Sequence, residues 1–248
     1  MITPSELLGS SRTRPCVRQV YGVSGSGKTY FLNRMLHATE SDKEFGPLWR
    51  AIVVDVKHDG YEDLVEELHT TASDAIETIQ KNRISVIHAD INYAQQDIDE
   101  IIEYLFHTAE RVPEFTATLV IEESSTFITP TRVPASIKRL ATQGRSLGLS
   151  LILANQRALS NKWTDTQSTS ITMFRLAIPD RKLLKDRWGV DAEALDLKLA
   201  TQKFSFAHYD LEDLGLRFFS ALPPKKPSKK KKRKAGRIGR NFFSFVKM

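Results

Sequence analysis

The sequence predicts an α/β fold with a mainly parallel central sheet flanked by helices. Short apolar runs rich in β-branched residues alternate along the chain with longer segments whose apolar residues follow helical spacing. A glycine-rich segment lies between the first run and a helical segment, and polar residues follow two later runs directly. Because strands that alternate with helices form a parallel sheet covered on both faces, these observations define the fold class.

The expected elements follow the chain in order. Five buried strands are expected over residues 16–21, 51–56, 84–88, 118–121 and 149–154. Helices are expected directly after the glycine-rich segment, over 95–110 and over 135–147. Toward the C-terminus the pattern predicts a strand over 171–176, a helix near 181–188, and strands over 203–209 and 216–221.

Composition divides the chain into an N-terminal arm over residues 1–15, a globular domain over 16–222 and a basic, Pro/Lys-rich tail over 223–248. The tail holds 11 of the 36 basic residues and no acidic one, so 36 minus 11 leaves 25 basic against 30 acidic residues elsewhere, a net charge of −5. The single cysteine, Cys16, excludes a disulfide framework and a thiolate zinc site. We find no signal-peptide pattern and no bilayer-spanning apolar stretch, so we expect a protein that is not secreted.

The glycine-rich segment fits the phosphate-loop pattern G-x-x-x-x-G-K-[ST] without a mismatch. It comprises Gly22, Val23, Ser24, Gly25, Ser26, Gly27, Lys28 and Thr29. Glycines allow backbone N–H groups to close around phosphate oxygens, and the following helix adds partial positive charge. Lys28 is expected to reach the outer phosphates, and the Thr29 hydroxyl to ligate Mg²⁺. The sequence therefore predicts a P-loop NTPase domain that binds ATP and Mg²⁺.

Two acids, Glu122 and Glu123, follow the strand expected over 118–121, in the manner of a Walker B segment. Ligands bind at the carboxyl ends of strands in such sheets. Glu122 is expected near Mg²⁺, and Glu123 is placed to polarise the attacking water. Many Walker B segments have Asp first, so the division of labour between the two acids stays open.

A further strand end carries Asn155 and Gln156, whose side-chain amides can hydrogen-bond the γ-phosphate or the attacking water. Arg145 ends the basic helix before this strand, and a guanidinium can stabilise charge on a transferring phosphoryl group. Arg157 is the competing candidate for that role.

Together, these segments resemble the FtsK–HerA superfamily of RecA-like P-loop translocases, and most of all the genome-packaging ATPases of membrane-containing, tailless viruses. The matching residues are G-V-S-G-S-G-K-T at 22–29, A-I-V-V-D-V-K at 51–57, T-L-V-I-E-E-S at 118–124 and Q-G-R-S-L-G-L-S-L-I-L-A-N-Q-R at 143–157. The resemblance covers about residues 15–222. It implies that Gln156 is a sensor of the γ-phosphate and that Arg145 acts on the nucleotide of a neighbouring subunit.

The resemblance also implies a homo-oligomer, a hexameric ring around double-stranded DNA, with ATP hydrolysed between subunits. Expected pore contacts are Arg132, Lys138 and Arg139, which follow the Walker B strand. Capsid or internal membrane proteins are expected partners, and the virion or the host cytoplasm the expected location.

The tail is expected to be disordered alone and to attract polyanions. Its main basic run comprises Lys229, Lys230, Lys231, Lys232, Arg233 and Lys234. Duplex DNA is the natural partner, but the aromatic residues that follow the charges also suit an anionic membrane surface.

Two other functions fit part of the pattern. A DNA-coupling or segregation ATPase of a plasmid or integrated element shares every motif, and only DNA-stimulated turnover with translocation separates it from a motor. A small-molecule P-loop kinase explains the phosphate loop but requires neither Glu122 and Glu123 nor Gln156.

Overall fold

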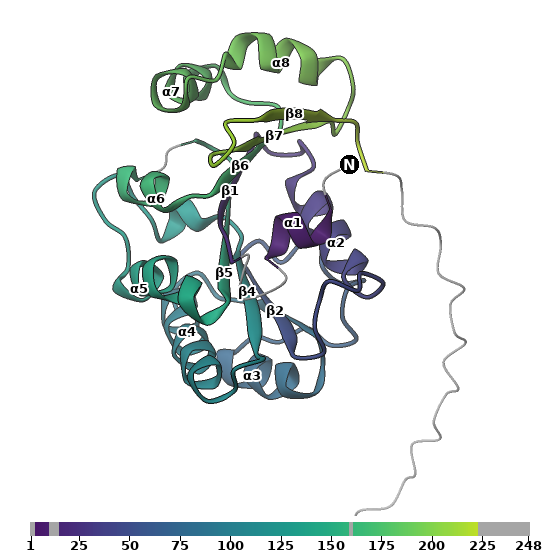
Figure 1. The fold of residues 1–248 in the computed structure, drawn as a ribbon, viewed down its shortest axis with the longest axis vertical. Coiled ribbons are helices and arrows are strands. Elements are labelled where there is room, and N and C mark those ends of the chain that lie inside the picture. The colour runs from purple at the N-terminus through teal and green to yellow at the C-terminus, as the bar shows by residue number, and fades with distance from the viewer. Residues whose placement is uncertain (1–2, 10–14, 159–160, 223–248) are drawn as a thin grey trace, which may run out of the picture.

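A computed structural model describes residues 3–9, 15–158 and 161–222, which form an eight-stranded sheet with helices on both faces (Figure 1). The strand order is β3-β2-β4-β5-β1-β6-β7-β8. The parallel strands are β1 (Val17–Tyr21), β2 (Trp49–Asp55), β3 (Ile84–His88), β4 (Thr116–Ile121), β5 (Leu149–Asn155) and β6 (Ser170–Met173). The last two strands, β7 (Phe206–Asp210) and β8 (Leu216–Phe219), are antiparallel. The mainly parallel α/β fold predicted from the sequence is confirmed.

One face of the sheet is covered by helices from the middle of the chain (Figure 1). These are α3 (Ala72–Lys81), α4 (Ala94–Arg111) and α5 (Ala135–Gln143), and the short α6 (Lys162–Gln167) lies on the same side. Their apolar residues pack with those of β4 and β5 into one core cluster, which includes Phe106 of α4. The 3₁₀ turn η2 (Gly144–Leu147) continues α5 and leads into β5, so the helix expected over 135–147 ends in a tighter turn.

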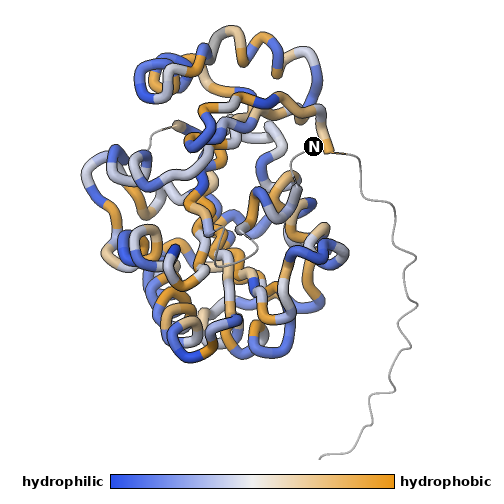
Figure 2. The backbone as a smooth tube through the Cα atoms, in the orientation of Figure 1, coloured by the Kyte–Doolittle hydropathy of each residue, from blue (hydrophilic) through white to orange (hydrophobic). Residues whose placement is uncertain are grey.

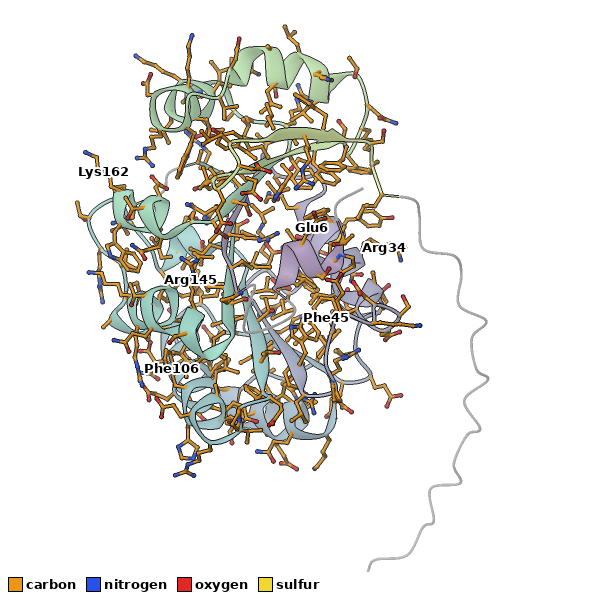
Figure 3. The ribbon with its side chains drawn as sticks, viewed as in Figure 1. Glu6, Arg34, Phe45, Phe106, Arg145 and Lys162 are labelled. Carbon is orange, nitrogen blue, oxygen red and sulfur yellow. The ribbon has the colours of Figure 1, made fainter. Side chains whose placement is uncertain are left out.

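The opposite face is covered by α2 (Lys28–Ala38) and by a short N-terminal helix, α1 (Pro4–Leu8). The N-terminal arm expected over residues 1–15 is therefore folded in part, because Leu7 and Leu8 are fully buried in the second core cluster. Phe45 belongs to this cluster, and Figure 3 shows it on the other side of the sheet from Phe106. Figure 2 shows hydrophobic residues along the central strands and on the inward sides of the helices.

The C-terminal part of the domain adds a third cluster, in which α7 (Ile178–Trp188) and α8 (Ala192–Ala200) pack near β6 and β7. Strand β6 ends at Met173, and β7 begins only at Phe206, so the strands expected over 171–176 and 203–209 are shorter than or displaced from their predicted ranges. The tail over 223–248, including its basic run, lies outside the described residues. Among the residues that are described, no helix combines the length and apolarity needed to cross a membrane.

Candidate functional site

The phosphate loop connects β1 to α2, as predicted, and its glycine backbone leaves room for a phosphate group to approach closely. Gly25 and Gly27 have left-handed backbone angles, with φ of 71° and 106°. A Cβ added at Gly22 would lie 2.6 Å from the Phe174 Cβ, so this position has no room for a side chain. No side chain caps the start of α2. Its first N–H groups can therefore donate hydrogen bonds to phosphate oxygens.

Lys28 lies within this loop and is only 4% exposed. Its Nζ donates hydrogen bonds to the carbonyl oxygens of Gly22 at 2.6 Å and Val23 at 3.3 Å. Burial and the nearby Lys57 together lower the pKa of Lys28 to about 8, while Glu122 acts in the opposite direction. The Lys28 ammonium thus bridges the start of the loop to the start of α2, at the position where the outer phosphates bind in phosphate loops.

Glu122 follows the last residue of β4 and is 1% exposed. The Tyr61 hydroxyl donates a 2.7 Å hydrogen bond to its Oε1, while Oε2 is buried without a hydrogen-bond partner. Burial raises the pKa of Glu122, and the Tyr61 hydrogen bond, Lys57 and the Thr29 hydroxyl oppose this shift.

A buried carboxylate oxygen beside a threonine hydroxyl fits Mg²⁺, which prefers oxygen ligands. Among the described residues, no group of three or more His, Cys, Asp or Glu side chains is placed to hold a metal ion. In NTPases, Mg²⁺ takes few protein ligands and completes its coordination with phosphate and water. Thr29 and Glu122 are therefore the residues that would hold it.

Glu123 lies next to this site in a left-handed backbone conformation, with φ 49° and ψ 43°. This conformation is uncommon outside glycine and marks strained positions, which cluster at functional sites. The Lys57 Nζ forms an ion pair with Glu123 Oε1. The Gln156 amide, at the end of β5, donates a 3.0 Å hydrogen bond to the same oxygen. The structure thus brings the two predicted residues Glu123 and Gln156 together, and adds Lys57.

Lys57 and Asp55 were assigned no role from the sequence. Asp55 ends β2, and its carboxylate accepts hydrogen bonds from the backbone N–H groups of Lys57 at 2.9 Å and Asp59 at 2.8 Å. This turn aims Lys57 at Glu123. The signal was present, because Asp55 and Lys57 lie at the end of a strand, as Glu122 does. What the sequence lacked was the strand order, in which β2 lies directly beside β4.

The other amide of this strand end has a structural partner. Asn155 Oδ1 accepts a 2.6 Å hydrogen bond from the backbone N–H of Ser125. Ser125 lies in the 3₁₀ turn η1 (Ser124–Thr126), directly after Glu123. Asn155 therefore fixes the segment that carries Glu123, while Gln156 contacts the carboxylate itself.

Arg145 lies in η2, at the opposite edge of the sheet from the phosphate loop. Its side chain lines a cavity of about 250 Å³ with residues at the starts of β1 and β6, together with Glu6 and His208; Figure 3 labels Arg145 and Glu6. The five-residue strand β1 separates the two edges by about 16 Å. Arg145 is therefore not part of its own chain's phosphate site.

Arg157, the competing arginine, follows Gln156 at the phosphate-loop edge. Its Nε donates a bifurcated hydrogen bond to the two carboxylate oxygens of Asp180 of α7, at 3.0 and 3.2 Å. This pairing anchors α7 to the end of β5 and gives Arg157 a structural role within the chain.

The three residues expected to contact DNA differ in their surroundings. Arg139 pairs with Glu103 at 2.7 Å and lies over the Phe106 ring at 4.0 Å, so helix α4 holds it. Arg132 and Lys138 are exposed, and Lys138 lies 6.0 Å from the Trp163 ring.

Solved structures with the same fold include nucleotide-binding packaging and secretion proteins. The genome packaging NTPase B204 from Sulfolobus turreted icosahedral virus 2, in complex with AMPPCP, matches with a TM-score of 0.65 at 20% identity, over 84% of this chain and 98% of that one. VirB4 of Thermoanaerobacter pseudethanolicus matches with a TM-score of 0.61 at 10% identity, over 84% and 89%. The cytoplasmic domain of the Thermomonospora curvata type VII secretion ATPase EccC matches with a TM-score of 0.51 at 16% identity, over 86% and 26%.

No protein-family model and no curated protein sequence matches this chain. The structural matches confirm the P-loop ATPase fold that the motifs predicted.

Proposed function

We propose that this chain is an ATPase that moves double-stranded DNA and packages a viral genome into a preformed capsid. One observation carries the proposal: Glu123, Gln156 and Lys57 meet beside the phosphate loop. A kinase site needs a phosphate loop. It does not need an acid such as Glu123 that is hydrogen-bonded by the Gln156 amide at the end of the neighbouring strand β5. The fold shared with a viral genome packaging NTPase supports the choice of cargo.

The residues of this edge divide the hydrolysis between them. Lys28 and the N–H groups of the loop bind the phosphates, and Glu123 orients the attacking water as general base. Mg²⁺, held by Thr29 and Glu122, would neutralise charge on the phosphate oxygens. Gln156 and Lys57 both contact Oε1 of Glu123. Loss of the γ-phosphate would therefore be transmitted from this oxygen to β5 through Gln156 and to β2 through Lys57.

Arg145 completes the site in this proposal from a neighbouring subunit. It lies at the edge far from its own phosphate loop, so a head-to-tail arrangement of copies brings it to the next copy's nucleotide. A closed arrangement of this kind is a ring, and we propose a hexamer around duplex DNA. Arg132 and Lys138 are its candidate pore contacts, and Arg139 contributes only if it leaves Glu103.

The basic run from Lys229 to Lys234 is proposed to bind DNA, with an anionic membrane surface as the alternative. Partners from the capsid or an internal membrane, and location in the virion or the host cytoplasm, belong to the same proposal.

A DNA-coupling or segregation ATPase is the second candidate, because it shares every motif of the nucleotide site. The two candidates share the nucleotide site and differ in what ATP turnover does to DNA. Translocation along a duplex, measured as displacement of a bound third strand, is expected only of the motor.

The deciding experiment measures ATP hydrolysis by the purified chain with and without long double-stranded DNA. We expect strong stimulation by DNA. Lys28→Ala should abolish DNA-stimulated hydrolysis. Glu123→Gln should lower the hydrolysis rate by about 10²–10⁴-fold while ATP binding is retained. Lys162→Ala, at an exposed position on α6 labelled in Figure 3, is the matched control and should leave turnover unchanged. Turnover that ignores DNA but responds to a small phosphoryl acceptor would establish the kinase instead.

A further inference from the structure

Phe204 is an aromatic residue at the phosphate loop that the proposed hydrolysis does not use. It lies between α8 and β7, is 37% exposed, and has a left-handed backbone with φ 63°. A large side chain in this conformation is a backbone outlier, and such residues persist only where their surroundings fix them. Here Ser205 and Phe206, the next two residues, fix the conformation of Phe204.

Ser205 and Phe206 hold the strained residue in place. The Ser205 hydroxyl donates to the carbonyl oxygens of Leu199 at 3.0 Å and Gln202 at 2.7 Å. The Phe206 ring is buried against Phe31, with ring centroids 4.6 Å apart. The chain is thus anchored on the C-terminal side of Phe204, which leaves the Phe204 ring at the surface beside the loop.

The ring lies directly against the loop backbone. A Cβ added at Gly27 would lie 2.9 Å from Phe204 Cδ1, so the ring occupies the space beside this glycine. The Tyr30 ring, one turn into α2, lies 6.3 Å from the Phe204 ring at an interplanar angle of 31°. Both aromatic residues line a hollow of about 300 Å³ together with Ser24, Gly25, Gly27, Lys28, Thr29, Lys57 and Asp59.

Sheet order separates the two ends of a nucleotide in this hollow. Lys57, Glu123 and Gln156 come from β2, β4 and β5, which lie on one side of β1. Phe204 precedes β7, which lies on the other side of β1, beyond β6. A triphosphate whose terminal phosphate lies at Glu123 therefore directs its nucleoside toward Phe204 and Tyr30.

We propose that Phe204 is the platform on which the purine base of the nucleotide stacks, with Tyr30 as its neighbour. The inference rests on the proposed ATP site and adds the residue that binds the nucleoside half. Stacking on an aromatic ring contributes to affinity but is tolerant of base identity, because every base has a π-face. Phe204 then supports ATP and GTP alike, and the phosphate loop binds the phosphates without it.

The test compares binding of AMPPCP and of inorganic tripolyphosphate, both with Mg²⁺, by calorimetry on the full chain. Phe204→Asn removes the ring and keeps a residue that tolerates the left-handed backbone. We expect AMPPCP affinity to fall by about 5- to 150-fold, the range measured for loss of one stacked base. Tripolyphosphate affinity should stay within about twofold of wild type, since the loop backbone that binds phosphates is unchanged. Phe204→Trp should retain wild-type AMPPCP affinity.

Phe218→Asn is the matched control, because Phe218 is also 37% exposed. Each of the two rings also has a lysine Nζ over it, Lys203 at 4.8 Å from the Phe204 ring and Lys198 at 3.8 Å from the Phe218 ring. Phe218→Asn should change neither affinity. Equal AMPPCP affinity in wild type and Phe204→Asn would overturn the stack, and so would a parallel loss of both ligands, which would make Phe204 a support of the loop. A wild-type chain that binds neither ligand would instead refute the nucleotide site itself.

Discussion

The two edges of the central sheet differ in what their charged residues do within the chain. At the edge with the carboxyl ends of the parallel strands, Lys28, Lys57, Glu122 and Glu123 are buried or paired around one phosphate loop. At the opposite edge, Arg145 lines a cavity and lies far from the phosphate loop of its own chain. The difference supports our proposal that each chain holds most of a hydrolytic site and contributes its Arg145 to the site of another copy.

The largest expected effect concerns Lys28 and the pH dependence of nucleotide binding. Its pKa of about 8 lies below the usual lysine value, so the ammonium loses its proton above pH 8. Bound phosphates favour the charged form, so binding takes up a proton in that range. ATP affinity should therefore fall by up to about tenfold per pH unit above pH 8. Calorimetry across pH 7–10 measures it.

Lys57→Met sharpens this prediction, because Lys57 lowers the pKa of Lys28. The variant should move the alkaline loss of affinity to higher pH. Lys28→Arg should remove the dependence, since a guanidinium stays charged throughout this range. Affinity that does not change between pH 8 and 10 in the wild type would show that Lys28 is not the group that binds phosphate.

A smaller effect is expected at Gly60, which packs against the phosphate-loop edge. A Cβ there would lie 2.6 Å from Thr29 Cγ2, and its φ of 95° is unfavourable for any other residue. Gly60→Ala should lower the free energy of unfolding by about 1–3 kcal/mol and weaken Mg²⁺-dependent ATP binding by displacing Thr29. Chemical denaturation measures the first effect and calorimetry the second.

Gly46→Ala is the control for Gly60, because nothing lies within 4 Å of a Cβ added at Gly46. Its stability should match wild type. If Gly60→Ala is as stable as Gly46→Ala and binds ATP normally, the close packing of this turn on Thr29 is refuted.

The last effect, which is confined to acid pH, is expected at the opposite edge, at His208. Burial, together with the nearby Arg18 and Arg217, lowers its pKa to about 3. The ring is neutral in the folded chain but gains a proton near pH 6.5 when unfolded. Its contribution is therefore present above pH 6.5 and lost as pH falls toward 3, by at most about 1.4 kcal/mol per pH unit.

His208→Asn retains a hydrogen-bonding partner for the Thr172 hydroxyl, which lies 3.0 Å from Nδ1. The variant should show a flatter decline of unfolding free energy between pH 6.5 and 4, with nucleotide affinity unchanged. A decline as steep as that of wild type would assign the acid sensitivity to other groups.

The sequence predicted most of the phosphate-loop edge because that edge is built from local patterns. Gly22–Thr29, Glu122, Glu123 and Gln156 each lie at the end of an apolar run, and parallel strands bring such ends together. Lys57 could not be assigned because its role depends on β2 lying beside β4. Strand order is set by long-range packing, which no local pattern records.

The remaining differences have the same origin. Helix α1 looks polar in sequence, yet a capping box at Thr3 and Glu6 and the burial of Leu7 and Leu8 fold it onto the domain. Phe204 was not singled out, because its position depends on a strained turn before β7. A predicted basic contact, Arg139, is held by Glu103 of a helix distant in sequence.

The most direct test of the central claim is whether Arg145 acts on the nucleotide of another copy. Arg145→Ala and Glu123→Gln should each lack DNA-stimulated hydrolysis when assayed alone. Mixed in equal amounts before DNA and ATP are added, they should regain about a quarter of the wild-type rate, because one interface in four then pairs an intact Glu123 with an intact Arg145. A mixture no more active than its separate components, or full activity of Arg145→Ala alone, would contradict a site shared between copies.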